Sequence, residues 1–391
     1  MISENIKSVR WLIFAHFTID CYPGMIAPLM PFIAGKIGIP MAAAMLVISI
    51  SNITSYLFQP IFGYFADKWL KRFFILWGMI LAAFFIPLIG VAQNIFALAF
   101  AIILGEIGVG FFHPQATSFL PLFCKNEENS KLNMGIFLSM GSAGYGVGAL
   151  VATRIYDVFG SEAIAYTSLF GILTALSMFL FVPKISADSS QHRLSLSMKE
   201  CVVEIFSHKV ERVLVFASIV KSMMISSFTM IMPFFWKSIG FSASKIGIIS
   251  CVFLATSTMG MILSPKIEKI VGTRNIFYIA FLSILPIAIL MKFLIGVNIY
   301  AAVLIYSLIG FLAFLTQPVN VVMSQKLLPK YKSMISGIVG GFTWGVVGIM
   351  LPLLSLFAQN VGILTGLCTI ACVPLIFSYW VRIIPKRPVE D

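Results

Sequence analysis

The stretch FFILWGMILAAFFIPLIGVA at positions 73–92 contains no charged residue. It is continuously apolar, and about 20 apolar residues are what a helix needs to cross the hydrocarbon of a bilayer. A membrane-spanning strand would need only about 10 residues of alternating polarity, so this stretch predicts a helix. Similar runs predict further spans at 9–33, 41–64, 95–121, 132–155, 162–182, 210–236, 243–264, 275–295, 299–324, 333–357 and 361–381. The expected fold class is an all-α integral membrane protein with twelve transmembrane helices.

The overall composition agrees with a chain that lies mostly in lipid. Of its 391 residues, 59% are hydrophobic and 11% are charged, whereas roughly 25% are charged in soluble domains. A soluble globule leaves much of its surface to water and cannot hide so much apolar area. The composition therefore excludes a cytosolic enzyme, a secreted disulfide scaffold and a disordered chain. The six cysteines form no C-x-x-C pair, so neither a disulfide framework nor a zinc site is expected.

The basic residues gather on one side of the predicted spans. With a cytoplasmic N-terminus, the cytoplasmic segments carry 21 Lys and Arg and the opposite segments carry five, while Lys221 falls inside a span. This asymmetry follows the positive-inside rule and predicts that both termini are cytoplasmic. The net charge of +12 is then explained by loops that face anionic lipid headgroups, and no nucleic-acid partner is expected.

The longest polar stretch, 183–209, separates two halves of six spans each. The halves resemble each other at an offset near 202 residues, so that Pro31 corresponds to Pro233. Parallel repeats of this kind are a standard plan of secondary transporters. We therefore expect an N-terminal six-helix bundle at 1–183, a cytoplasmic linker at 184–209 and a C-terminal six-helix bundle at 210–391.

The loop GYFADKWLKR at 63–72 resembles the G-x-L-A-D-R-x-G-R-K loop of the major facilitator superfamily. It departs from that pattern at the second glycine, where Leu70 stands. The resemblance implies the major facilitator fold, a monomeric protein and transport by alternating access. In that family the loop forms a cytoplasmic charge network that latches the outward-facing state. The resemblance assigns this gating role to Asp67, Lys71 and Arg72.

Two shorter stretches resemble the fosmidomycin-resistance-type exporters of the same superfamily. One is HF at 16–17, followed by Asp20 and by PLMP at 28–31; the other is GFFHPQA at 110–116. Gln115 stands where that group has a glutamate. The resemblance implies an exporter in the bacterial inner membrane.

Five ionisable side chains lie well inside the predicted spans: His16, Asp20, Glu106, His113 and Lys221. A charge at mid-bilayer costs roughly 2.5–3.5 kcal/mol on insertion scales, so each is a functional candidate. His16 and Asp20 are four residues apart and share a helix face, and so do Glu106 and His113, which are seven apart. In the superfamily, spans one, four, seven and ten line the central cavity, and these residues belong to spans one, four and seven.

Two further expectations concern the neighbours of these residues. Pro114 should move His113 out of right-handed helical geometry and free a backbone carbonyl. The repeat offset places Lys221 beside the counterpart of Asp20, so we expect Lys221 to be a counter-ion to Asp20 or Glu106. A carboxylate that exchanges a proton for a substrate or a lysine is a workable coupling device.

The expected site residues fall into two sets. Proton coupling is assigned to Asp20, Glu106 and His113. The substrate-binding set is His16, Asp20, Tyr22, Glu106, His113, Lys221, Gln317 and Asn320.

The fifth span carries closely spaced glycines, which permit close helix approach. We expect them to pack and slide between the two halves. They are Gly135, Gly141, Gly144, Gly146 and Gly148.

No catalytic motif is present in the sequence. H-E-x-x-H, G-x-S-x-G, the P-loop and G-x-G-x-x-G are all absent, so neither an enzyme nor a cofactor is expected. Without a P-loop, the expected drive is an ion gradient, worth about 2.3 kcal/mol per charge per 100 mV. We expect a proton-coupled antiporter that exports small organic molecules or drugs, anionic or zwitterionic because of Lys221 and the histidines.

Three alternatives stay open at this point. The same fold can import an organic anion or nutrient by proton symport. His16, Asp20, Glu106 and His113 are also a plausible set of ligands for transport of a divalent metal. The last alternative is a receptor or scaffold that transports nothing.

Overall fold

The computed structural model describes residues 6–58, 62, 73–125, 127–183, 198–328, 335 and 337–386. Every regular element in these ranges is a helix, and no strand occurs in them. Eleven helical segments of the described residues are long and apolar enough to cross a membrane. The span predicted at 41–64 corresponds to the shorter apolar helix Met41–Leu57. The expected all-α membrane fold is confirmed.

Contacts divide the chain into two compact units. The first unit comprises Met1–His192 and Trp236–Cys251, and the second comprises Arg193–Phe235 and Val252–Asp391. The predicted gating residues Asp67, Lys71 and Arg72 lie outside the described residues, as does most of the predicted linker.

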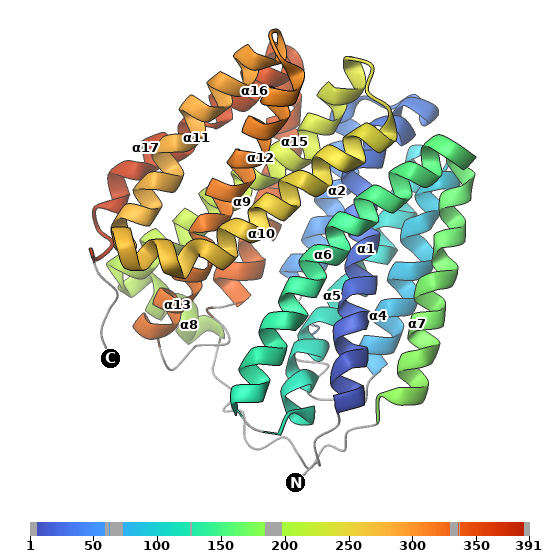
Figure 1. Ribbon diagram of the computed structural model, residues 1–391, viewed down its shortest axis with the longest axis horizontal. Coiled ribbons are helices and arrows are strands. Elements are labelled where there is room, and N and C mark those ends of the chain that lie inside the picture. Colours follow the sequence, from blue (N-terminus) through green and yellow to red (C-terminus); the bar gives the residue numbers. More distant parts are fainter. Residues whose placement is uncertain are drawn as a thin grey trace. The chain divides into compact units, whose positions relative to one another are not determined.

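The first unit is built mainly from six long helical segments (Figure 1). They are α1 (Ile6–Ile37), α2 (Met41–Asn52) with the π-helical turn η1 (Ile53–Leu57), α4 (Phe73–Phe85) with the 3₁₀ turn η2 (Ile86–Val91), α5 (Ile95–Phe119) with η3 (Leu120–Phe123), α6 (Glu127–Phe159), and η4 (Glu162–Thr167) with α7 (Ser168–Phe181).

The second unit contains a short amphipathic helix followed by the remaining spans (Figure 1). These elements are α8 (Met198–Ser207), α9 (Lys209–Ser238), α10 (Ala243–Val271), α11 (Thr273–Ile295), α12 (Ile299–Leu315), α13 (Gln317–Leu327), the π-helical turn η7 (Ile338–Phe342), α15 (Thr343–Val361), α16 (Ile363–Ile370) and α17 (Cys372–Val381). The end of α9 and the start of α10 are grouped with the first unit.

Helix α1 is the most deeply buried element of the first unit, and it packs most extensively against α6. Glycines on α6 allow this contact, because a Cβ atom on Gly144 or Gly148 would overlap the backbone carbonyl of Phe17 or Cys21. The expectation that these glycines lie between the two halves is therefore wrong for Gly144 and Gly148. Their missing side chains admit the backbone of α1 within the same unit.

The tenth predicted span is interrupted in the second unit. Helix α12 ends at Leu315, and α13 begins at Gln317 with Pro318 in its first turn. Proline lacks the backbone N–H that would continue the ladder of α12, so the break lies where the sequence demands it. The break is one residue long, at Thr316, and the two helices together form the single span Ile299–Leu327.

Candidate functional site

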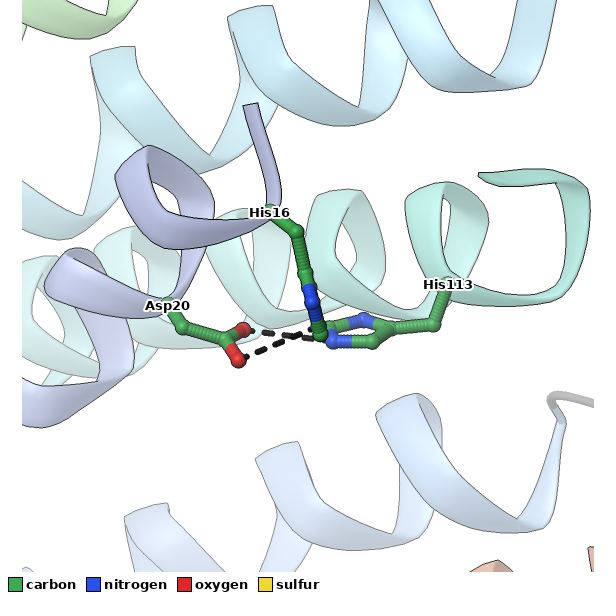
Figure 2. A group of neighbouring side chains, drawn as sticks. All are labelled: His16, Asp20 and His113. Carbon is green, nitrogen blue, oxygen red and sulfur yellow. Dashed lines mark ion pairs between the residues drawn. The ribbon is translucent and has the colours of Figure 1, made fainter. Parts of the chain in front are cut away.

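Three of the predicted residues meet inside the first unit (Figure 2). His16 and Asp20 come from adjacent turns of α1, and His113 comes from α5. One carboxylate oxygen of Asp20 lies 3.3 Å from Nε2 of His16, and the other lies 3.2 Å from Nε2 of His113. The carboxylate therefore bridges two imidazoles on two helices.

The three side chains differ in their access to solvent. The exposed fraction of the side chain is 4% for His16, 15% for Asp20 and 26% for His113. His16 is held against the ring of Phe137, with the ring centroids 3.8 Å apart. His113 is therefore the most exposed member of the cluster.

The second nitrogen of each imidazole is held by a backbone carbonyl. Nδ1 of His16 lies 2.6 Å from the carbonyl oxygen of Phe137, and Nδ1 of His113 lies 2.8 Å from that of Val109. A carbonyl oxygen can only accept a hydrogen bond, so both Nδ1 atoms carry a hydrogen. In a neutral histidine, Nε2 is then a bare acceptor.

This hydrogen-bond arrangement determines how many protons the cluster needs. An ionised carboxylate also only accepts, so each Nε2–oxygen contact of Asp20 brings two lone pairs together unless a proton lies between them. There are two such contacts. Both contacts become hydrogen bonds when the cluster gains two protons, counted from the state with an ionised carboxylate and two neutral imidazoles.

Gly141 on α6 makes room for the cluster. A Cβ atom at this position would overlap the ring of His16 and would lie 2.6 Å from an oxygen of Asp20. The sequence predicted Gly141 only as a packing residue. Its spacing from Gly144 and Gly148 marks a close-packed face, but only the structure shows which side chains fill the space.

Glu106 is buried on α5, two turns before His113. It faces the side chain of Ser55 on η1, and it interacts electrostatically with His113 and Asp20. Glu106 therefore adds a second carboxyl group to the interior of the unit that holds the cluster.

Helix α5 does not break at Pro114. The helix runs from Ile95 to Phe119, and His113 keeps helical geometry, so the predicted departure of His113 is wrong. The hydroxyl of Thr117 donates to the carbonyls of His113 (2.9 Å) and Pro114 (3.0 Å). Side-chain hydroxyls of this kind help transmembrane helices to tolerate proline.

Lys221 is buried in the second unit, with 1% of its surface exposed. It donates a hydrogen bond to the side-chain oxygen of Gln317, and its ammonium lies 5.7 Å from the ring centroid of Trp344. Within the described residues of this unit, no carboxylate pairs with Lys221. Its predicted pairing with Asp20 or Glu106 would join the two units and stays a prediction.

Two other predicted residues connect helices within their own unit. The hydroxyl of Tyr22 donates to the carbonyl of Thr167 (3.0 Å), which connects α1 to η4. Nδ2 of Asn320 donates to the carbonyl of Leu214 (3.0 Å) and to the hydroxyl of Ser218 (2.8 Å) on α9.

The cluster could also hold a metal ion. One ligand atom each from His16, Asp20 and His113 lies within 4.8 Å of the others. Glu106, the fourth residue of the set expected from the sequence, is not part of this group.

The sequence profile of the Major Facilitator Superfamily matches residues 12–352. The chain belongs to the major facilitator superfamily. It is a multi-pass membrane protein of a family of small-molecule transporters, as the sequence predicted.

Known proteins resemble the chain over most of its length. It is 21% identical over 358 residues to the fosmidomycin resistance protein of Escherichia coli (strain K12). The aligned region covers 89% of this chain and 86% of that protein. Among solved structures, a POT family transporter in complex with 5-aminolevulinic acid has a TM-score of 0.78 at 12% identity and covers 96% of this chain and 95% of its own. The nucleoside transporter NupG has a TM-score of 0.74 at 15% identity, with coverage of 96% and 98%. At these identities the structural likeness shows the fold alone.

Proposed function

We propose that this transporter is a proton-coupled antiporter that exports small organic anions or zwitterions by alternating access. It lies in the bacterial inner membrane with both termini in the cytoplasm. The observation that supports proton coupling is the pair of contacts between Asp20 and the Nε2 atoms of His16 and His113, because each contact needs a proton.

In this proposal Asp20, Glu106 and His113 carry the coupling protons. When protons leave the cluster, lone pairs face each other across two contacts, and the contacts must open. Since one contact joins α1 to α5, loss of that proton changes the packing of these two helices. Histidine suits this role because it changes charge between pH 5 and 8.

Lys221 and Gln317 bind the anionic group of the substrate. No carboxylate of the described residues in the second unit pairs with the buried ammonium of Lys221, which leaves hydrogen-bonding capacity for an anion. Charge-assisted hydrogen bonds of this kind are about twice as strong as neutral ones. The wider substrate set, including Tyr22 and Asn320, and the gating role of Asp67, Lys71 and Arg72 stay predictions.

Proteoliposomes under an imposed pH gradient test the proposal, with fosmidomycin as the probe because a distant relative confers resistance to it. An acidic lumen should drive fosmidomycin into the vesicles, since protons then leave as the compound enters. Asp20→Asn should abolish this accumulation but keep exchange of fosmidomycin at equal pH. The matched control is Glu162→Gln, which changes an exposed carboxylate that pairs with Lys36 at 2.6 Å.

Other outcomes contradict the proposal. If Asp20→Asn accumulates fosmidomycin as the wild type does, Asp20 is not a coupling residue. Accumulation driven by acid outside the vesicles would indicate import by symport. Uptake of Zn²⁺ in place of fosmidomycin would indicate metal transport.

A further inference from the structure

The second unit contains buried side-chain oxygen atoms on Glu211, Ser324 and Asn320, and of these residues only Asn320 belongs to the predicted substrate set. Glu211, in the first turn of α9, is 0% exposed, and neither of its carboxylate oxygens has a hydrogen-bond partner among the described residues. The hydroxyl of Ser324 and the side-chain oxygen of Asn320, both on α13, are likewise buried and have no partner in that part of the chain.

These side chains lie along one seam between two helices. The amide nitrogen of Asn320 donates to the carbonyl of Leu214 and the hydroxyl of Ser218, which brings α13 against α9. Ser324 follows Asn320 by one turn, and Leu214 follows Glu211 by about one turn. The side chain of Ser324 faces the carboxylate of Glu211.

A carboxylate that stays ionised in a buried site is costly unless a positive charge offsets that cost. The nearby titratable group is His208, but it is exposed and contacts Glu204 at 3.2 Å. The positive end of the α9 dipole supplies only part of a charge. Among the described residues, His208 is therefore the one charged group that acts on Glu211, and it does not supply a buried compensating cation.

The donor atoms indicate what this cation is. Carboxylate, hydroxyl and amide oxygens are the ligands of hard cations, and the set lacks sulfur and imidazole. It carries one formal negative charge, which matches a monovalent ion rather than Mg²⁺ or Ca²⁺. Leu214, Val319 and Met323 belong to a buried hydrophobic core cluster beside these oxygen atoms.

We infer that Glu211, Ser324 and Asn320 bind a sodium ion within the second unit. The amide nitrogen of Asn320 is held by its two hydrogen bonds, so the amide oxygen is the atom of this side chain that remains for the ion. This oxygen is the third ligand. The site would make the second unit dependent on an ion other than the proton proposed for the first unit.

Thermal unfolding of the purified protein tests the inference without substrate or pH gradient. The protein is transferred to choline chloride, and NaCl is added at constant ionic strength and pH. Binding to the folded state stabilises it by mass action, so the melting temperature should rise with the logarithm of the sodium concentration once this exceeds the dissociation constant, by about 2–4 °C over the range tested. Glu211→Gln should abolish the rise, and Ser324→Ala should need about tenfold more sodium for the same rise.

Glu204→Gln is the matched control, because it changes an exposed glutamate on the neighbouring helix α8. It should keep the full sodium response. An absent response in the wild type, an equal response to KCl, or a response that survives in Glu211→Gln overturns the inference. Since no transport is measured, these results are independent of the proton-coupling proposal.

Discussion

In the first unit, the buried carboxylate of Asp20 lies between two imidazoles, whereas in the second unit the buried ammonium of Lys221 contacts a neutral amide and an aromatic ring. Glu211, the buried carboxylate of the second unit, has no hydrogen-bond partner in the described residues. At Asp20 the first unit thus balances a buried carboxylate with its own side chains. In our two proposals, ligands balance the buried charges of the second unit, an anion at Lys221 and a cation at Glu211.

The largest expected effect comes from breaking the balance of the first unit. His113→Leu leaves Asp20 with one imidazole in a buried site, and removal of one partner from a buried pair costs roughly 3–5 kcal/mol. The free energy of unfolding, measured by titration with a denaturing detergent, should fall by that amount at neutral pH. His208→Leu, which removes an exposed histidine, should change it little. Equal effects of the two substitutions would show that the cluster is not a charge-balanced unit.

Lys221→Met tests the second unit, where the buried ammonium contacts a neutral amide and an aromatic ring. Lys221 is a buried cation that pairs with no carboxylate among the described residues of the second unit, so its removal should leave the melting temperature unchanged or higher. Binding of fosmidomycin, measured by calorimetry, should weaken by about 100-fold, because charged hydrogen bonds are lost. Lys292→Met, at an exposed lysine that donates to Thr365, should leave both quantities unchanged. A clear loss of stability without loss of affinity would assign Lys221 a structural role.

Gly141→Ala sharpens the comparison within α6. The added methyl group would press on His16 and Asp20, and overpacking of this kind costs about 1–3 kcal/mol. Gradient-driven accumulation of fosmidomycin should fall more than exchange at equal pH. Nothing lies within 4 Å of a Cβ atom at Gly135 on the same helix, so Gly135→Ala should behave like the wild type. If both variants transport equally, the space at Gly141 is irrelevant to coupling.

The smallest effect is expected for a charge pair in water. Glu162→Gln removes the exposed partner of Lys36. Exposed pairs contribute little because water and salt screen them. Its melting temperature and its gradient-driven transport should match the wild type, and a marked drop in either would show that exposed charges matter as much as the buried ones.

Much of the fold was predictable from the sequence because its dominant signal is local. Uncharged runs such as 73–92 are long enough to span a bilayer, and the loop at 63–72 carries the family pattern. The contact between His16 and Asp20 could also be predicted from the sequence, since residues four apart share a helix face. The contact between Asp20 and His113 could not be predicted in this way, because it depends on which faces of α1 and α5 pack together.

Other features depend on tertiary contacts that no local pattern shows. Pro114 should disrupt a helix, yet α5 continues through it. In the sequence, Glu211 is an ordinary acidic residue at the start of a helix. Only the structure shows that its side chain is buried against α13. The partner of Lys221 in its own unit is Gln317, a polar residue that the sequence placed only in the wider substrate set.

Proton release on substrate binding tests the central claim most directly. Purified protein in weakly buffered solution is mixed with fosmidomycin, and the pH change is followed with an indicator dye. If the cluster around Asp20 gives up protons for substrate, the wild type should release between one and two protons for each molecule bound, following the two contacts that need them, and Asp20→Asn should release fewer. Binding of fosmidomycin without proton release, or equal release by the wild type and Asp20→Asn, would contradict the account.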